Sequence, residues 1–238
     1  MKKLQSTVRR AITDFNLIED GDVIAVGVSG GKDSLALLSV LCAMRIYLPQ
    51  KFTLKALMLD LGFDGFDPAP FIKYCEELNV ECIVKKTDIA QVVFNIRKES
   101  NPCSLCAKMR RGALNELAKE QGCNKVALGH HCDDAIETFF MSLLYEGRLN
   151  CFDAKCYLDR TDITVIRPFI YTEEKDIENF ANSEKLPIVK NPCPADGFTK
   201  RQYTKDLISM LEKENKDAKQ HITKAITDGL LLKNIQKP

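Results

Sequence analysis

The segment Ser29-Gly30-Gly31-Lys32-Asp33-Ser34 constrains this chain most, because it stands where an apolar run gives way to a helical pattern. Residues 23–28 are short, apolar and rich in valine, which predicts a buried strand. Leucine and valine then recur at helical spacing over residues 35–41. Two glycines at such a turn let backbone N–H groups converge on an anion, and the positive end of the helix points at the same place. The segment therefore predicts a cradle for nucleotide phosphates.

The spacing of this loop excludes the two best-known phosphate loops. A Walker loop places four residues between its first glycine and the Gly-Lys pair, and a dinucleotide fingerprint reads Gly-x-Gly-x-x-Gly. Residues 26–31 match neither pattern. Lys32 adds a mobile cation, and Ser29 and Ser34 add hydroxyl donors, so we expect a phosphate site of another kind.

The length and composition indicate one large domain, or one domain with appendages, in 238 residues that are 45% hydrophobic. No apolar run is long enough to span a bilayer. The basic start, Met1-Lys2-Lys3, is followed by polar residues and not by an apolar signal segment. We therefore expect a soluble cytoplasmic protein with no membrane partner.

Strand-like and helix-like segments alternate along the chain, which predicts an α/β fold with a parallel sheet covered by helices on both faces. The predicted strands are residues 23–28, 53–60, 80–85, 125–129 and 163–166, and the predicted helices include 4–18, 70–78, 104–121, 133–145 and 172–185. A short helical extension of two amphipathic helices is expected over residues 200–232. Because ligands of such sheets bind beyond the carboxyl ends of the strands, Asp60, at the end of the second strand, joins the phosphate loop as a candidate nucleotide contact.

A second polar motif, Gly129-His130-His131-Cys132-Asp133-Asp134, follows the fourth predicted strand and opens a helix. One of the two aspartates is enough to cap that helix, which is the purely structural interpretation. Two carboxylates that face a phosphate cradle also suit Mg²⁺, which bridges protein carboxylates to substrate phosphates. We favour this functional interpretation, in which His130 contacts a phosphate or stabilises charge on the α-phosphate.

The ten cysteines do not resemble a disulfide framework, because several stand singly in apolar or helical surroundings. The candidates for reactive or metal-binding cysteines are Cys103, Cys106, Cys132 and Cys193. The pair Cys103-Ser104-Leu105-Cys106 precedes a basic helix, where a thiolate is favoured. Spacing alone leaves metal binding, redox chemistry and chance all open for this pair, and it does not join the pair to Cys193.

The net charge of +1 does not point to a polyanionic partner, but the local balance differs. Residues 97–125 carry seven lysines or arginines against three acids, and residues 200–238 carry nine against five. Basic surface of this size is compatible with RNA and is also common on solvated helices.

Taken together, these motifs resemble the tRNA 2-thiocytidine synthetase family of PP-loop ATP pyrophosphatases. The resemblance runs from about residue 20 to residue 215. It rests on the Ser-Gly-Gly-Lys-Asp-Ser loop, the Cys-x-x-Cys before a basic helix, the Gly-His-His-x-Asp-Asp string, Ile166-Arg167-Pro168-Phe169 and a late Pro-Cys. It implies an adenine nucleotide alpha hydrolase-like fold.

The resemblance also implies an ATP-dependent tRNA sulfurtransferase that adenylates a base, most simply the 2-oxygen of a cytidine in the anticodon loop, and replaces that oxygen by sulfur. In that family three cysteines hold a [4Fe–4S] cluster, and by motif position these correspond to Cys103, Cys106 and Cys193. Three ligands leave one iron open for the sulfur that is transferred. Three thiolates and a water also suit Zn²⁺, which stays an alternative.

The candidate site residues other than the cysteines fall into three sets. The expected ATP contacts are Ser29, Gly30, Gly31, Lys32, Asp33, Ser34, Asp60, Gly129 and His130. The expected catalytic residues, with Mg²⁺, are Lys32, Asp33, Asp133 and Asp134. The residues expected to hold the RNA backbone are Lys108, Arg110, Arg111, Lys200 and Arg201.

Two departures from the family pattern stand out. Pro194-Ala195-Asp196-Gly197 lacks the second cysteine that the family usually carries in its late motif, and Cys132 stands where the family commonly has another residue. Two other functions stay open. One is a PP-loop ATP pyrophosphatase acting on a small substrate without RNA, with cysteines that bind zinc or carry persulfide. The other is a nucleotide-sensing or metal-storage module, against which the paired aspartates argue.

The expected organisation is an N-terminal helix (residues 1–20), a PP-loop ATP-binding domain with an inserted Cys-x-x-Cys helix (21–190), and a late cysteine loop with a helical extension (191–238). A sulfur donor such as a cysteine desulfurase or inorganic sulfide is implied, and a homodimer is one option for assembly.

Overall fold

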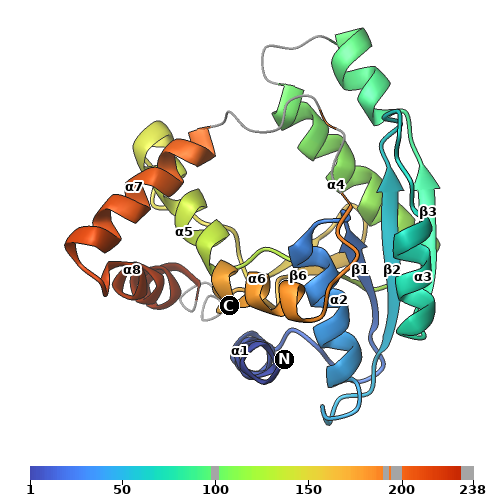
Figure 1. Ribbon diagram of the computed structural model, residues 1–238, viewed down its shortest axis with the longest axis horizontal. Coiled ribbons are helices and arrows are strands. Elements are labelled where there is room, and N and C mark those ends of the chain that lie inside the picture. Colours follow the sequence, from blue (N-terminus) through green and yellow to red (C-terminus); the bar gives the residue numbers. More distant parts are fainter. Residues whose placement is uncertain (98–101, 190–192, 194–199, 232–238) are drawn as a thin grey trace.

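Six strands form one sheet in the order β3-β2-β1-β4-β6-β5 (Figure 1). The computed structural model describes residues 1–97, 102–189, 193 and 200–231. The strands are β1 (Val23–Val28), β2 (Thr53–Asp60), β3 (Glu81–Lys86), β4 (Lys125–Ala127), β5 (Lys155–Leu158) and β6 (Ile163–Ile166). The α-helices are α1 (Lys2–Phe15), α2 (Lys32–Met44), α3 (Ala69–Glu77), α4 (Pro102–Glu120), α5 (Cys132–Met141), α6 (Glu174–Ser183), α7 (Lys200–Glu214) and α8 (Ala218–Ile226). Three π-helical segments are η1 (Gln91–Arg97), η2 (Ser142–Glu146) and η3 (Thr227–Leu231).

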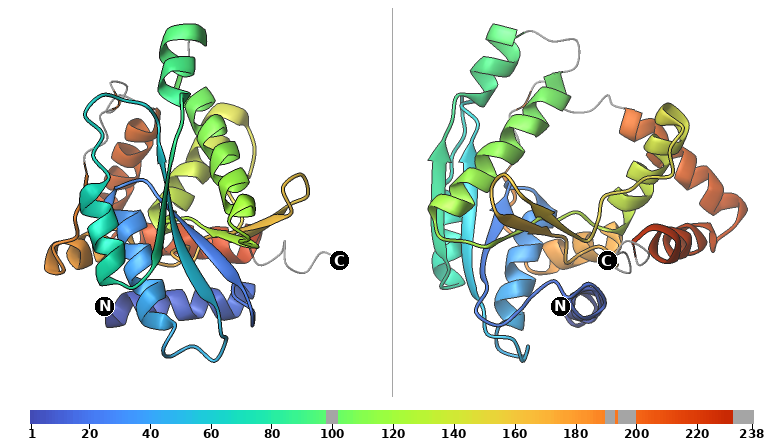
Figure 2. Two further views of the ribbon diagram at one scale, coloured as in Figure 1. Left: turned by 90° about the vertical axis from the view of Figure 1, so that its right-hand side faces the viewer. Right: turned by 180° about the vertical axis from the view of Figure 1, so that it is seen from behind.

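The central strand β1 is buried on both faces, which explains its continuous apolar sequence. Ile24 and Val26 point into the larger hydrophobic core, and Ala25 between them points into a second core on the other face. The larger core lies under α1, α2, α3 and α6, whereas α4 covers the opposite face with Leu117 and Ala118 (Figure 2). The predicted sheet with helices on both faces is thus confirmed.

The sheet differs from the predicted one at its edge. Strand β5 was not expected, and it pairs antiparallel with β6, so the sheet is mixed and not wholly parallel. Its four residues have no clear alternation of apolar and polar side chains, and Tyr157 on it is exposed. A strand this short is formed by its hairpin with β6, which a pattern within the strand does not reveal. The segment η1 likewise lies between the predicted strand 80–85 and the predicted helix 104–121, where no element is predicted.

The switch in strand order falls between β1 and β4. From β1 the chain runs outward through β2 and β3, and it then returns to place β4 on the other side of β1. The pairs β1–β2, β1–β4 and β4–β6 are all parallel. The carboxyl ends of β1 and β4 therefore diverge around a crevice, which is where ligands of such folds bind.

The helical extension was expected over residues 200–232, and α7 and α8 occupy most of this range. Both helices pack against α5, so they lie at the side of the sheet that carries β4 and β6 (Figure 1). Across the described ranges, no helix combines the length and the apolar character that crossing a membrane requires.

A buried ion pair ties the start of β4 to the loop before β1. The Nζ atom of Lys125 lies 2.8 Å from Oδ2 of Asp22, and both side chains are almost completely buried. Asn124 connects the same two segments, because its Nδ2 donates to Asp22 Oδ1 and its Oδ1 accepts from Val23 N–H. This cluster sets the starting point of the β1–β4 pairing, three residues from the polar motif beyond β4.

We expect Lys125→Ala to lower the free energy of unfolding by about 3 to 5 kcal/mol, because it leaves the Asp22 carboxylate buried without its cation. The matched control is Lys119→Ala, which removes an exposed ion pair with Asp162 and should cost less than about 1 kcal/mol. Urea unfolding of both variants measures the difference. Equal losses in the two variants would contradict the role given to the buried pair.

Candidate active site

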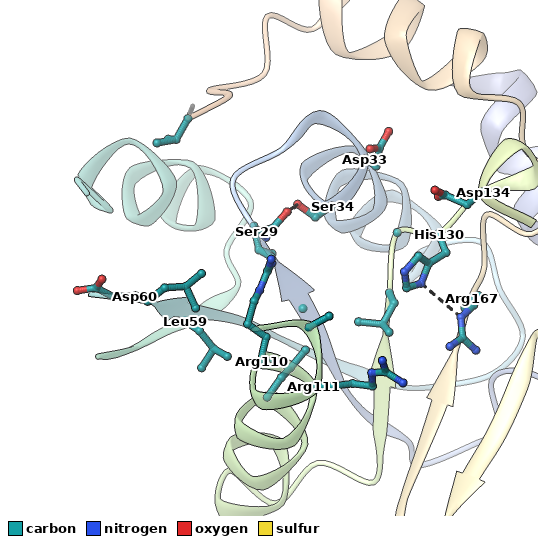
Figure 3. Close-up of a pocket in the computed structure, with 18 of the residues that line it drawn as sticks. Ser29, Asp33, Ser34, Leu59, Asp60, Arg110, Arg111, His130, Asp134 and Arg167 are labelled. Atoms are coloured by element: carbon teal, nitrogen blue, oxygen red, sulfur yellow. Dashed lines mark hydrogen bonds between the residues drawn. The ribbon is translucent and has the colours of Figure 1, made fainter. Parts of the chain in front are cut away.

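A cavity of about 650 Å³ opens at the carboxyl ends of β1, β2 and β4. Figure 3 shows its lining, to which the phosphate loop, β2, α4, the motif after β4 and the residue after β6 all contribute. The predicted site residues in its wall are Ser29, Asp33, Ser34, Asp60, Gly129, His130 and Asp134. The structure therefore brings the two sequence motifs to one cavity.

The phosphate loop has the geometry that its glycines permit. Gly30 has a φ of +83°, which strains any residue with a side chain, and Gly31 is the N-cap of α2. The Oγ atom of Ser34 donates to Gly31 O and accepts from Ser29 N–H, at 3.0 and 3.2 Å. The N-terminus of α2 thus faces the cavity wall formed by Ser29 and Ser34, as an anion site requires.

Gly129 lets the strand β4 approach the start of α2. A Cβ atom at this position would lie 3.0 Å from the backbone carbonyl of Asp33 and 3.1 Å from the nitrogen of Ser34. These are backbone atoms that no rotamer change can move, so a side chain at this position would have to push the backbone of α2 away by a few tenths of an ångström. The two motifs are therefore in backbone contact, which a pattern of side chains does not predict.

Lys32 does not appear among the cavity-lining residues. Its Nζ atom lies 2.8 Å from Oε1 of Glu174 and 3.2 Å from Oδ1 of Asp33. Burial opposes its charge, but the hydrogen bond that Lys32 donates to Glu174 and the charge of Asp33 outweigh burial and raise the pKa of Lys32. A phosphate in the loop would have to compete with Glu174 for this cation.

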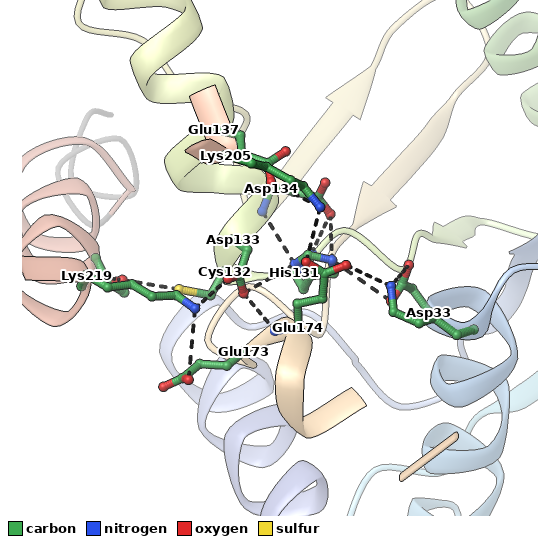
Figure 4. A network of polar contacts seen from close by, with 12 residues as sticks. Asp33, His131, Cys132, Asp133, Asp134, Glu137, Glu173, Glu174, Lys205 and Lys219 are labelled. Atoms are coloured by element: carbon green, nitrogen blue, oxygen red, sulfur yellow. Dashed lines mark hydrogen bonds and ion pairs between the residues drawn. The ribbon is translucent and has the colours of Figure 1, made fainter. Parts of the chain in front are cut away.

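The structure separates the two adjacent aspartates of the second motif (Figure 4). Asp134 lines the cavity, whereas Asp133 turns away, accepts the N–H of Glu174 at 2.7 Å and pairs with Lys219 of α8. Asp133 therefore caps α6 and anchors α8. Burial disfavours its charge, but the neighbouring His131 ring, the Lys219 ammonium and the Glu174 N–H hold the pKa of Asp133 well below its usual range.

His131 and not an aspartate is the N-cap of α5. Its Nδ1 accepts from Asp134 N–H, and Oδ2 of Asp134 accepts from His131 N–H at 3.1 Å, which makes a capping box. Burial would lower the pKa of His131, yet the neighbouring carboxylates of Asp133, Asp134 and Asp33 outweigh it and raise that pKa. Asp134 thus serves the helix and the cavity together.

Cations from α7 complete the acidic cluster. Arg201 contacts Asp134 at 2.9 Å and Glu137 at 3.4 Å, and Lys205 lies 3.6 Å from Glu137 and 3.2 Å from Glu174. Glu137 is almost fully buried, and burial raises its pKa although both cations oppose the rise. Helix α7 therefore neutralises acids that the second motif would otherwise leave buried and unpaired.

The expected RNA contacts lie in different surroundings. Arg110 and Arg111 of α4 project into the cavity wall, and Lys108 on the same helix is exposed. Arg201 is committed to the acidic cluster, and the side chain of Lys200 lies outside the described residues. The first two arginines therefore belong to the cavity itself.

The three expected cluster cysteines lie near one another. Cys103 and Cys106 stand on the first turns of α4, and Cys193 interacts electrostatically with Cys106. Burial raises the pKa of Cys106, Arg110 opposes the rise, and the Cys193 and Cys103 thiols add to it. In the described ranges no set of three or more His, Cys, Asp or Glu side chains is yet close enough to hold a metal ion. The Pro194–Gly197 departure lies outside the described residues.

Several site residues were not assigned a role from sequence. Arg167 and Phe152 line the cavity beside His130, and Glu174 holds Lys32. Arg167 follows directly on a predicted strand, so its place at the carboxyl edge of the sheet was a usable signal. Glu174 and Phe152 come from segments that carry no such pattern.

The fold and the site together define a nucleotide-binding protein of the doubly wound class, with a phosphate loop at the switch point and an acidic motif on the neighbouring strand. Comparison with known proteins gives the family. Residues 2–209 match the model described as "PP-loop domain". The tRNA-cytidine(32) 2-sulfurtransferase of Geobacter sulfurreducens is 40% identical over 228 residues, which cover 94% of this chain and 89% of the relative.

Solved structures agree with this result. The U34-tRNA thiolase NcsA from Methanococcus maripaludis, solved with its [4Fe–4S] cluster, superposes with a TM-score of 0.79 at 27% identity, over 94% of this chain and 76% of that one. The NH3-dependent NAD synthetase from Campylobacter jejuni shares the fold alone, with a TM-score of 0.51 at 16% identity over 100% of this chain and 97% of that one. The chain belongs to the PP-loop ATP pyrophosphatases and, within them, to the family of the tRNA-cytidine 2-sulfurtransferases.

The different surroundings of the two aspartates give a direct test. We expect Asp133→Ala to lower the free energy of unfolding by about 3 kcal/mol, because Lys219 and the N-terminus of α6 lose their acceptor. Asp134→Ala should cost only about 1 kcal/mol through its cap but should weaken Mg²⁺-dependent ATP binding. Urea unfolding and calorimetric titration with ATP and Mg²⁺ measure both. An Asp133→Ala variant as stable as Asp134→Ala would contradict this division.

Proposed function

We propose that this protein is an ATP-dependent tRNA sulfurtransferase that adenylates the 2-oxygen of cytidine 32 in a tRNA and replaces that oxygen by sulfur. Relatives that are about 40% identical to this chain over almost its full length are named for this activity. The observation that carries the proposal is the meeting, at one cavity, of the phosphate loop, Asp134 and the arginines of the helix that begins with Cys103 and Cys106. A small-substrate ATP pyrophosphatase has no need for that cysteine-bearing basic helix at the cavity.

ATP binds with its phosphates on residues 29–34 and its base toward the apolar wall near Asp60. Phe63 and Phe66 stand in that wall, next to Leu59 and Leu61. The N-terminus of α2 and the hydroxyls of Ser29 and Ser34 meet the phosphate oxygens. Lys32, freed from Glu174, offsets the charge of the departing pyrophosphate.

Mg²⁺ suits the carboxylates on either side of the loop. The buried Oδ1 atom of Asp33 has Lys32 Nζ 3.2 Å away but accepts no hydrogen bond of good geometry among the described residues, and Asp134 lines the same cavity. Mg²⁺ usually takes one or two carboxylates and completes its shell with water and substrate phosphate, so a third protein ligand is not needed. Asp33 and Asp134 would hold the ion, and Asp133 would support them from behind.

The tRNA base reaches the cavity by leaving the stack of its loop, which is easier in an anticodon loop than in a duplex. Arg110 and Arg111 would meet the nucleotide inside the cavity, and the exposed Lys108 on the same helix would hold the RNA backbone.

The cysteines fit an iron–sulfur cluster by donor type. Fe–S clusters require thiolate ligands, and Cys103 and Cys193 each lie close enough to Cys106 to raise its pKa. With these three as ligands, a [4Fe–4S] cluster would supply an iron site for the sulfur that is transferred. The Arg110 guanidinium beside Cys106 favours the thiolate that such ligation needs.

The division into an N-terminal helix (1–20), an ATP-binding domain (21–190) and a cysteine loop with helical extension (191–238) is part of this proposal. So is a sulfur donor of the cysteine desulfurase or inorganic sulfide type. A homodimer is the assembly we would test first.

Iron, sulfide and zinc analysis after anaerobic purification tests the cysteine assignment. We expect close to four irons for each chain, and loss of iron in Cys103→Ala, Cys106→Ala and Cys193→Ala with loss of tRNA thiolation, because each removes one of only three ligands. The matched control Cys156→Ala changes a cysteine on the edge strand β5 and should keep both.

One zinc and no iron would contradict the cluster and leave a structural metal. Thiolation that survives all three variants would contradict the sulfurtransferase proposal as stated.

A further inference from the structure

Arg167 stands beside His130 because two neighbouring strands end together. Strand β6 pairs in parallel with β4, and Leu128 N–H donates to Ile166 O at 2.9 Å just beyond the paired residues. The residues that follow each strand, His130 and Arg167, therefore leave the sheet edge side by side and both line the cavity (Figure 3).

The contact between them has a defined polarity. Arg167 Nε donates to Nδ1 of His130 at 3.3 Å. Arginine carries only donors and stays charged, so the imidazole nitrogen that faces it must be a bare acceptor. The proton of the neutral ring is then on Nε2, and no hydrogen bond from that nitrogen is found in the described part of the chain.

The pair is held rigidly by its surroundings. Arg167 also donates through Nη1 to the carbonyl of Asp153, and its guanidinium lies 4.8 Å from the ring centroid of Phe152. The Phe152 ring lies 5.2 Å from the His130 ring. The Nε and Nη1 groups of Arg167 thus already donate hydrogen bonds, and the face of its guanidinium lies against Phe152. Little of this side chain is left to bind an RNA phosphate.

The neutral form of His130 follows from its neighbours. Burial first, and the charge of Arg167 second, lower the pKa of His130 to about 4. Asp134 on α5 opposes the fall, while Arg201 on α7 and the adjacent His131 add to it. A neutral ring has one N–H, so which nitrogen carries it decides what the ring can do.

We infer that Arg167 is a positioning residue that fixes His130 as its Nε2–H tautomer, so that this N–H donates to an α-phosphoryl oxygen of ATP during adenylation. The role of ATP in this inference rests on the proposed function, whereas the contact between Arg167 and His130 does not. A donor that is already oriented costs no reorganisation when charge develops on the oxygen. Without Arg167 the neutral ring divides between two tautomers, and only one of them carries its N–H donor on Nε2.

The direct test is the ¹⁵N NMR spectrum of the full-length protein labelled in histidine, which has only three histidines to assign. Near neutral pH we expect His130 to show a proton on Nε2 and a bare Nδ1, without any substrate present. Arg167→Leu should give a mixture of both neutral forms, and Arg167→Lys should keep more of the original one. A wild-type His130 protonated on Nδ1, or a tautomer unchanged in Arg167→Leu, would overturn the inference.

A double-mutant cycle on tRNA-dependent AMP formation shows whether Arg167 acts through His130. We expect His130→Ala to lower kcat about a hundredfold and Arg167→Leu about tenfold, with the KM for ATP little changed. In the double variant the Arg167 change should add less than about twofold, because its partner is gone. Losses that multiply would overturn the inference.

The control is Arg160→Leu, an exposed arginine in the turn between β5 and β6, which should leave both readouts unchanged. If Arg167→Leu does not fold, the wild-type spectrum and Arg167→Lys still decide the tautomer. If the wild-type protein forms no AMP with tRNA, the proposed function is contradicted. The ¹⁵N spectrum still decides the tautomer of His130, because it needs no substrate.

Discussion

The parallel pairing of β1 with β4 is the constraint on which the site depends. It places the loop after β1 and the motif after β4 on opposite sides of the switch point, although about a hundred residues separate them in sequence. The register is set at one end by the buried pair of Lys125 and Asp22, and at the other end by the backbone contact of Gly129 with the start of α2. A slip of one residue would exchange the two faces of a strand that is buried on both. The relative positions of the phosphate loop, the acidic motif and the cavity therefore all depend on this one pairing.

The charges around the acidic motif explain why the helical extension belongs to the site. Asp133 is held by Lys219 of α8, and Asp134 is held by Arg201 of α7. Removing one partner of a buried ion pair costs several kcal/mol, so these helices stabilise the motif against its own repulsion. The cost of that arrangement is competition, because a metal ion that binds Asp134 must displace or outweigh Arg201. Under the proposed Mg²⁺ site, helix α7 would be coupled to binding of the metal–nucleotide complex through Arg201.

The sequence predicted the parts of the fold that depend on local pattern. The α/β class, five of the six strands and the family itself were confirmed, because buried strands and phosphate-loop glycines leave a strong local trace. The edge strand β5 was missed because it is formed only by pairing with β6. The divergence of Asp133 from Asp134 also escaped prediction, since both follow the same strand and only the packing of α6 and α8 separates them. Arg167 was visible as a motif residue, but its contact with His130 depends on the order of strands in space. The assignments of individual contacts to ATP, metal and RNA stay predictions.

The bond that is cleaved in ATP tests the central claim most directly. The proposed chemistry transfers AMP to the base, so the loop of residues 29–34 must hold a departing pyrophosphate and not a single phosphate. Incubation of the iron-loaded protein with unmodified tRNA, a sulfide source and ATP labelled at the α-phosphate separates the two. We expect AMP and pyrophosphate in equal amounts, matched to the 2-thiocytidine formed in the tRNA. Formation of ADP, or of AMP that does not depend on tRNA, would contradict the assignment of this cavity as a site of base adenylation.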